Sequence, residues 1–198
     1  MTTRIASFVF LAFFLSATVA RAQSFDLSAN FVGSRWSEFD GADLGIGGRL
    51  SWKPTPILGV EGEFNWYPSG FPSGHAFSGQ RLEGVFAVTA GPKLGRVRPF
   101  VRAGAGFLNS SEAPEAFPCI AIFPPPLACA LAAGDTMPTF EFGGGLEITT
   151  SRATFLRFDA GDRMVKYHGP TFGAADELLS DGFVGHAFKF TFGGGWRF

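Results

Sequence analysis

The sequence predicts an all-β fold, an eight-stranded antiparallel up-and-down transmembrane β-barrel. Three observations predict it. Apolar and polar residues alternate with a period of two through most of the chain, as they do along a half-buried strand. Phe and Gly are abundant, with 25 and 27 residues among 198, and this pairing suits pleated strands better than helices. Beyond residue 22, no segment holds the roughly 18 unbroken apolar residues that a membrane helix needs.

Residues 1–22 have the features of an export signal, and residues 23–198 are then expected to form one barrel domain. Arg4 supplies a charged start, Ile5–Leu15 form an apolar core, and Ala20–Ala22 fit a small-x-small cleavage site. The alternative is a retained membrane anchor, which the short apolar run disfavours. We therefore expect cleavage after Ala22.

The first four predicted strands each carry apolar residues on one face and polar or small residues on the other. Successive side chains of a strand point to opposite faces, so each set of alternate apolar residues marks one side. In chain order these sets are Phe25, Leu27, Ala29 and Phe31; Leu44, Ile46, Leu50 and Trp52; Leu58, Val60, Phe64 and Trp66; and Leu82, Phe86, Val88 and Ala90.

The last four predicted strands repeat the pattern. Their apolar sets are Val101, Ala103, Ala105 and Phe107; Phe140, Phe142, Leu146 and Ile148; Leu156, Phe158 and Ala160; and Phe188, Phe190, Phe192, Gly194, Trp196 and Phe198. Strands of about nine to eleven residues cross a bilayer at a tilt. The number of predicted strands is even, as it is in single-chain bacterial barrels.

The predicted connections alternate between short and long. Short turns lie near residues 53–56, 95–97 and 149–152, and long links span about 35–42, 67–79, 109–138 and 164–181. Bacterial barrels have short periplasmic turns and longer outer loops. Both ends of the barrel domain are therefore expected on the periplasmic side.

The polar faces carry balanced charges, and this decides which face lies inside. A soluble, lipocalin-like carrier would keep its apolar face inside, and alternation alone does not exclude it. Acids and bases interleaved with Gly suit a narrow polar interior in which each charge is paired. Aromatic residues near strand ends suit girdles at the membrane interfaces, and those expected there are Trp52, Trp66, Tyr67 and Trp196. The predicted interior ion-pair network comprises Asp26, Arg49, Glu61, Glu63, Arg81, Glu83, Arg102, Glu141, Glu147, Arg157, Asp159, Lys189 and Arg197.

The segment Phe190–Phe198 resembles the C-terminal signal of outer-membrane barrel proteins. That signal, which the barrel-assembly machinery reads, has a final Phe with alternate apolar residues before it, here Phe190, Phe192, Trp196 and Phe198, and Gly194 departs from it. The chain from residue 23 resembles the small barrels of OmpA/OmpX type, including the segment Arg98–Gly106. The resemblance implies a monomer in the bacterial outer membrane that contacts outer-membrane lipid.

Cys119 and Cys129 lie within the longest link, and an exported chain favours a disulfide between them. It would close a loop of about eleven residues and contribute roughly 3 kcal/mol on the chain-entropy model. Two unpaired thiols are the alternative. Residues 116–131 are apolar and rich in Pro, which is unusual for an exposed outer loop. We expect the link 109–138 to bind a protein or another surface ligand. The alternatives are that it covers the barrel mouth, enters the outer leaflet or only packs on its neighbours.

Few residues suggest catalysis, and no metal, cofactor or nucleic-acid motif is found. A lipid-modifying barrel would need a Ser nucleophile, a His and an acid near the outer rim. The candidates are His186 with Ser180 and Asp181 or Glu177, and the weaker pair His75 and Ser78; the remaining histidine is His168. Gly143–Gly145 and Gly193–Gly195 lie inside predicted strands, without the helix that a phosphate loop needs.

The expected function is therefore a structural or surface-interaction role without catalysis. A narrow gated pore is the first alternative, since side chains can fill an eight-stranded barrel and a change of ion-pair partners could open it. Such a gate would exchange Glu61 or Glu141 between Arg102 and Arg157. An enzyme acting on outer-leaflet lipid is the second alternative.

Overall fold

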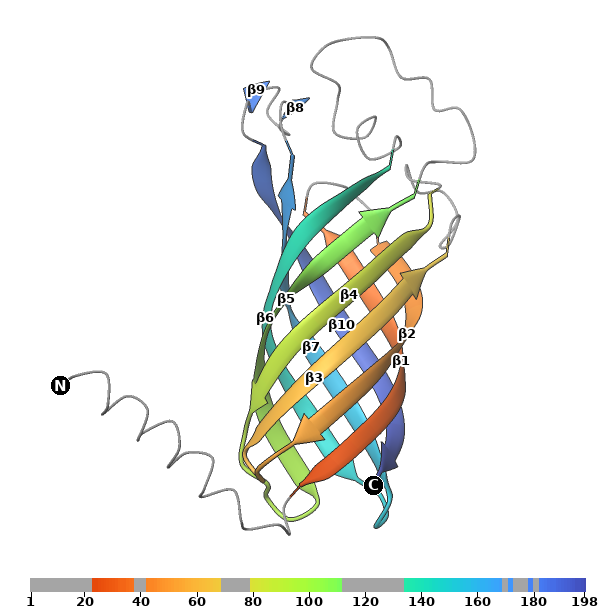
Figure 1. Ribbon diagram of the computed structural model, residues 1–198, viewed down its shortest axis with the longest axis vertical. Helices are drawn as coiled ribbons and strands as arrows, with labels where there is room; N and C mark the ends of the chain where they lie inside the picture. The colour runs from red at the N-terminus through yellow and green to blue at the C-terminus, as the bar shows by residue number, and fades with distance from the viewer. Residues whose placement is uncertain are drawn as a thin grey trace, which may run out of the picture.

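The computed structural model describes residues 23–37, 42–68, 79–111, 134–168, 171–172, 178–179 and 182–198. Within them, eight long antiparallel strands form a closed barrel (Figure 1), which confirms the predicted fold class. No helix in this described part of the chain is long and apolar enough to cross a membrane. The barrel strands are β1 (Ser24–Trp36), β2 (Ala42–Lys53), β3 (Leu58–Tyr67), β4 (Arg81–Ala90), β5 (Val97–Ser110), β6 (Asp135–Thr149), β7 (Thr154–Tyr167) and β10 (Phe183–Arg197).

Each barrel strand pairs with its neighbours along the chain, and β1 closes the barrel by pairing with both β2 and β10. At the centre of that closure, Phe31 lies opposite Ile46 on one side and Phe192 on the other. Two short strands, β8 (Thr171–Phe172) and β9 (Leu178–Leu179), pair only with each other and were not predicted.

The two ends of the barrel differ, and we call them the turn end and the loop end. The turn end carries the short connections 54–57, 91–96 and 150–153, and Gly95 adopts a positive φ of 64° that suits a glycine turn. The backbones of Phe25 and Phe198 exchange hydrogen bonds of 3.2 and 2.8 Å there. The C-terminus is labelled at this end in Figure 1.

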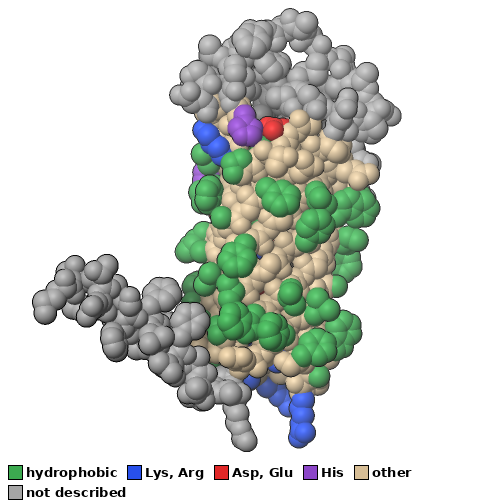
Figure 2. Space-filling model, viewed as in Figure 1, with side chains coloured by type: hydrophobic (Ala, Val, Ile, Leu, Met, Phe, Trp, Pro, Cys, Tyr) green, Lys and Arg blue, Asp and Glu red, His purple; other side chains and the backbone are tan. Residues whose placement is uncertain are grey.

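The outer wall of the barrel is apolar, as the predicted faces require. Phe31 is 68% exposed and Phe142 is 64% exposed, although both are large hydrophobic residues. Figure 2 shows hydrophobic side chains distributed over the wall, with charged and His side chains near its two ends. So large an apolar surface is not stable in water, but lipid tails cover it. The strand side chains therefore assign the wall to a membrane.

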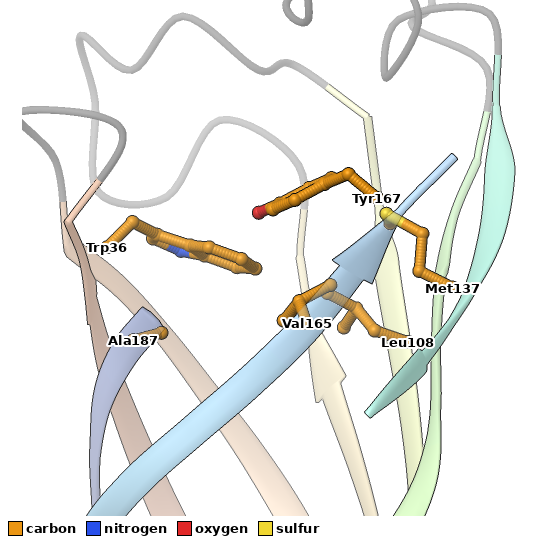
Figure 3. Close-up of a cluster of buried hydrophobic side chains, with 6 residues drawn as sticks. All are labelled: Trp36, Leu108, Met137, Val165, Tyr167 and Ala187. Atoms are coloured by element: carbon orange, nitrogen blue, oxygen red, sulfur yellow. The ribbon is translucent and has the colours of Figure 1, made fainter. Parts of the chain in front are cut away.

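The strands extend further at the loop end than predicted, and this corrects the predicted loop bounds. Asn109, Pro138 and Met164 lie within strands instead of links. At the opposite, turn end, Lys53 is the last residue of β2 instead of part of a turn. In the extensions at the loop end, several large apolar residues point inward, beside buried polar residues such as Ser110 and Thr139. Figure 3 shows the resulting buried cluster, which we call the apolar cap: Trp36, Leu108, Met137, Val165, Tyr167 and Ala187.

Candidate functional site

The candidate site is the charged interior of the barrel, which begins near the turn end with a closed ring of two acids and two bases. Lys53 Nζ lies 2.6 Å from Asp26 and 2.5 Å from Glu147. Arg197 Nη2 lies 2.8 Å from Asp26 and 2.5 Å from Glu147. Each carboxylate thus contacts both bases, and the ring is neutral. Inward-facing alternate positions of β1, β2, β6 and β10 bring these side chains together.

The middle of the interior is built around two glutamates of β3. Glu61 lies 2.7 Å from Arg102 and 2.7 Å from Arg157. Glu63 lies 2.5 Å from Arg49 and 3.0 Å from Arg102. All five side chains are buried. Because each base touches more than one acid, this layer is a network and not a set of separate pairs.

Nearer the loop end, Glu83 is the acceptor for several buried groups. Lys189 Nζ lies 2.9 Å from Glu83 and Arg163 Nη1 lies 2.8 Å from it. The Tyr67 hydroxyl donates to Glu83 at 2.9 Å, and the Asn65 amide donates at 2.8 Å. Tyr67 is therefore buried inside the barrel, which corrects its predicted place at a membrane interface. A buried carboxylate with this many donors has its lone pairs satisfied, which the low dielectric of an interior requires.

The apolar cap joins this network through Trp36. The Arg163 guanidinium lies over the Trp36 ring, 4.6 Å from its centroid, in a cation–π contact. The Trp36 indole N–H donates to Asp43 at 2.7 Å, and Asp43 forms a 2.7 Å ion pair with Arg81. Charged and apolar side chains therefore fill the loop end of the interior together.

Several ion pairs join strands on opposite sides of the barrel. Arg157 on β7 and Glu61 on β3 are four strands apart in the closed order, as are Lys189 on β10 and Glu83 on β4. A space of about 20 Å³ beside Arg102, close to the minimum for one water molecule, lies within this network. The described interior buries the acids Asp26, Asp43, Glu61, Glu63, Glu83, Glu141, Glu147 and Asp159 and the bases Arg49, Lys53, Arg81, Arg98, Arg102, Arg157, Arg163 and Lys189, with Arg197 partly buried.

All thirteen charged residues of the predicted interior network point into the barrel, and four further charged residues lie there with them. Asp43 and Lys53 share the inward face of β2 with Arg49, and Arg163 shares the face of Arg157 on β7. Continuing the period-two count past the predicted strand ends would have found these three. The fourth is Arg98 on β5.

The rim histidines pair with acids on the outer surface at the loop end. His186 Nδ1 lies 2.7 Å from Asp162, and His168 Nδ1 lies 2.8 Å from Asp135, with all four side chains substantially exposed. The Ser37 hydroxyl donates to the main-chain carbonyl of His186 at 2.7 Å. No group of three His, Cys, Asp or Glu that could hold a metal occurs among the described residues. The candidates outside those residues are His75, Ser78, Cys119, Cys129, Glu177, Ser180 and Asp181.

The apolar residues of the C-terminal segment point outward. Phe190, Phe192, Trp196 and Phe198 are exposed on the wall or at its turn end, and the Phe192 ring stacks on Phe158 with centroids 4.7 Å apart. Gly194, which departs from the expected signal, lies between Ala29 and Leu156 in the register.

Comparison with known proteins gives the fold. No protein-family model and no curated protein sequence matches the chain. Neisserial surface protein A (NspA) is 11% identical with a TM-score of 0.54, and the match covers 89% of this chain and 97% of that one. The outer membrane protein OprG from Pseudomonas aeruginosa is 12% identical with a TM-score of 0.48, and the match covers 89% of this chain and 96% of that one. The N-terminal β-barrel domain of OprF from the same organism is 15% identical with a TM-score of 0.47, and the match covers 87% of this chain and 97% of that one. The fold is that of small eight-stranded outer-membrane barrels, as the sequence resemblance implied.

Proposed function

We propose that this protein is an integral outer-membrane barrel that acts as a closed structural or surface-interaction scaffold and has no catalytic role. The turn end then lies in the periplasm, because short connections face the periplasm in such barrels. The apolar wall contacts outer-membrane lipid, and the protein acts as a monomer. Its C-terminal apolar residues serve recognition by the barrel-assembly machinery.

The observation that carries this proposal is the set of ion pairs across the interior. Arg157 and Glu61 connect opposite walls at 2.7 Å, and Lys189 reaches Glu83 and Glu141 from the other side. Buried charges are costly unless they are paired, so the filled arrangement is also the stable one. A barrel whose interior is filled in this way holds the ends of its outer loops in place and leaves no wide channel through which solutes could diffuse.

If the protein is a scaffold, recognition falls to the long link between β5 and β6, which was predicted as residues 109–138 and spans 111–134 between the observed strands. Its sequence between Cys119 and Cys129 is apolar and contains Pro124–Pro126, which is unusual for a segment that faces water. A disulfide between the two cysteines would restrict its conformations and so reduce the ordering cost of binding. The expected partner is a protein or another ligand at the cell surface.

Single-channel recording in planar lipid bilayers tests the closed scaffold. The folded full chain should give no steady current above that of the lipid alone, and neither should the control variant Arg152→Ala, which changes an exposed turn residue. A steady current that Arg102→Ala or Glu141→Ala abolishes would contradict the proposal. That result would favour the narrow gated pore, in which Glu61 or Glu141 exchanges between Arg102 and Arg157.

A further inference from the structure

Arg98 is a buried cation of the interior that has no carboxylate within ion-pair distance among the described residues. It is 4% exposed. Its Nε donates to the carbonyl of Gly91 at 3.3 Å and its Nη2 donates to the carbonyl of Ile57 at 2.9 Å, but Nη1 has no hydrogen-bond partner. A buried guanidinium without a compensating acid is unfavourable unless another anion compensates it.

The nearest acid along the pairing is already engaged. Glu147 lies directly opposite Arg98 in the register of β5 and β6. Its two carboxylate oxygens contact Lys53 and Arg197, each at 2.5 Å. The described interior therefore has one more base than acids, and the base left without an acid lies near the turn end.

Arg98 also lines a cavity of about 320 Å³ that opens at the turn end. Lys and Arg side chains project from this end in Figure 2. Asp26 and Glu147 neutralise the lining bases Lys53 and Arg197, so the excess positive charge that attracts anions comes from Lys93, Arg96 and Arg98. The bases that line it are Lys53, Lys93, Arg96, Arg98 and Arg197, and Gln23, Ser24, Thr55 and Thr149 add polar groups.

We propose that this cavity binds a phosphate group, free or carried by a lipid headgroup, with Arg98 as its fixed contact. The bound group would receive charge-assisted hydrogen bonds from Arg98 and from the exposed Lys93 and Arg96. The excess of bases favours a dianion over a singly charged carboxylate. This binding site is a function in addition to the proposed scaffold role. It depends only on the residues that line the cavity at the turn end.

Binding is tested by NMR titration of the full chain in nanodiscs of zwitterionic lipid. Inorganic phosphate, added at constant ionic strength, should give saturable shifts of the backbone amides of residues 91–98, and acetate should bind more weakly. Arg98→Gln should lower the phosphate affinity at least about tenfold, the loss expected for a hydrogen bond to a charged group. Arg152→Gln, which removes an exposed base from another turn at the same end, should leave the affinity unchanged.

A second variant keeps the test independent of folding. Lys93→Gln with Arg96→Gln changes only exposed side chains of the turn and should lower the affinity several-fold. Adding phosphatidylglycerol to the nanodiscs should weaken the apparent phosphate affinity if lipid headgroups reach the site, and leave it unchanged if only free phosphate does. Shifts that do not saturate, or an equal loss with Arg152→Gln, would overturn the proposal. Neither result would bear on the closed interior, which conductance tests separately.

Discussion

At the scale of single residues, Arg163 shows how strongly the barrel depends on paired charges. It is 1% exposed and forms a 2.8 Å ion pair with Glu83. The same guanidinium donates to the Ser34 hydroxyl at 2.6 Å and covers the Trp36 ring. Such a side chain leaves water at a cost of several kcal/mol, so its partners must offset that cost. Arg163 therefore links the charged network to the apolar cap.

Replacing Arg163 with Ala should destabilise the barrel by about 3–5 kcal/mol, because Lys189 is then the one charged partner of Glu83 among the described residues and a cavity opens beside Trp36. Urea unfolding of the protein folded in lipid vesicles measures the change. The exposed control Arg152→Ala should stay within about 0.5 kcal/mol of the wild type. Equal effects of the two substitutions would show that the buried pairing contributes nothing to stability.

At the scale of strands, the apolar face changes sides between the two ends of one strand. In β5, Val101 and Phe107 face outward, but the next residue, Leu108, is 1% exposed and belongs to the apolar cap. In β6, Phe142 faces outward, whereas Met137 points inward. Lipid surrounds the wall, so apolar residues face out there. Nearer the loop end, the residues of the apolar cap turn inward instead, as apolar residues do in a soluble barrel.

This change of side explains what the sequence could and could not predict. The eight membrane segments were predictable because their alternation is regular. The extensions were not, because the inward Leu108 follows the outward Phe107 and the pattern looks interrupted. Arg98 was missed for a related reason: Phe100, on the same inward face, is apolar but buried beneath the Arg157 guanidinium, 4.2 Å from its ring centroid. Because one apolar residue lies on the otherwise polar inward face, the sequence does not show that Arg98 lies on that face too.

The depth of a strand residue should set the cost of a charge on the outer wall. Phe142 lies at the middle of β6 and Leu58 begins β3 at the turn end, and both are exposed. Phe142→Arg should destabilise the barrel by about 2–4 kcal/mol, and Leu58→Arg by about 0–1 kcal/mol. Urea unfolding in vesicles of defined thickness gives both values. A larger cost at Leu58 than at Phe142 would contradict the placement of the wall in the bilayer.

At the scale of the whole molecule, the barrel reverses the usual order of a soluble protein. Its wall is apolar, its interior is a nearly balanced charge network, and the apolar cap lies inside its loop end. The four tryptophans lie in different regions of the barrel. Trp36 is 9% exposed inside the barrel, whereas Trp52, Trp66 and Trp196 are 40%, 39% and 57% exposed on the wall.

Fluorescence quenching by lipids with brominated acyl chains tests this arrangement most directly. Each of four variants would keep one tryptophan and carry Phe at the other three positions. The variants that keep Trp52, Trp66 or Trp196 should be quenched in brominated vesicles, and the variant that keeps Trp36 should retain its fluorescence. Strong quenching of Trp36 with protection of the other three would contradict the account, because the apolar face would then lie inside the barrel.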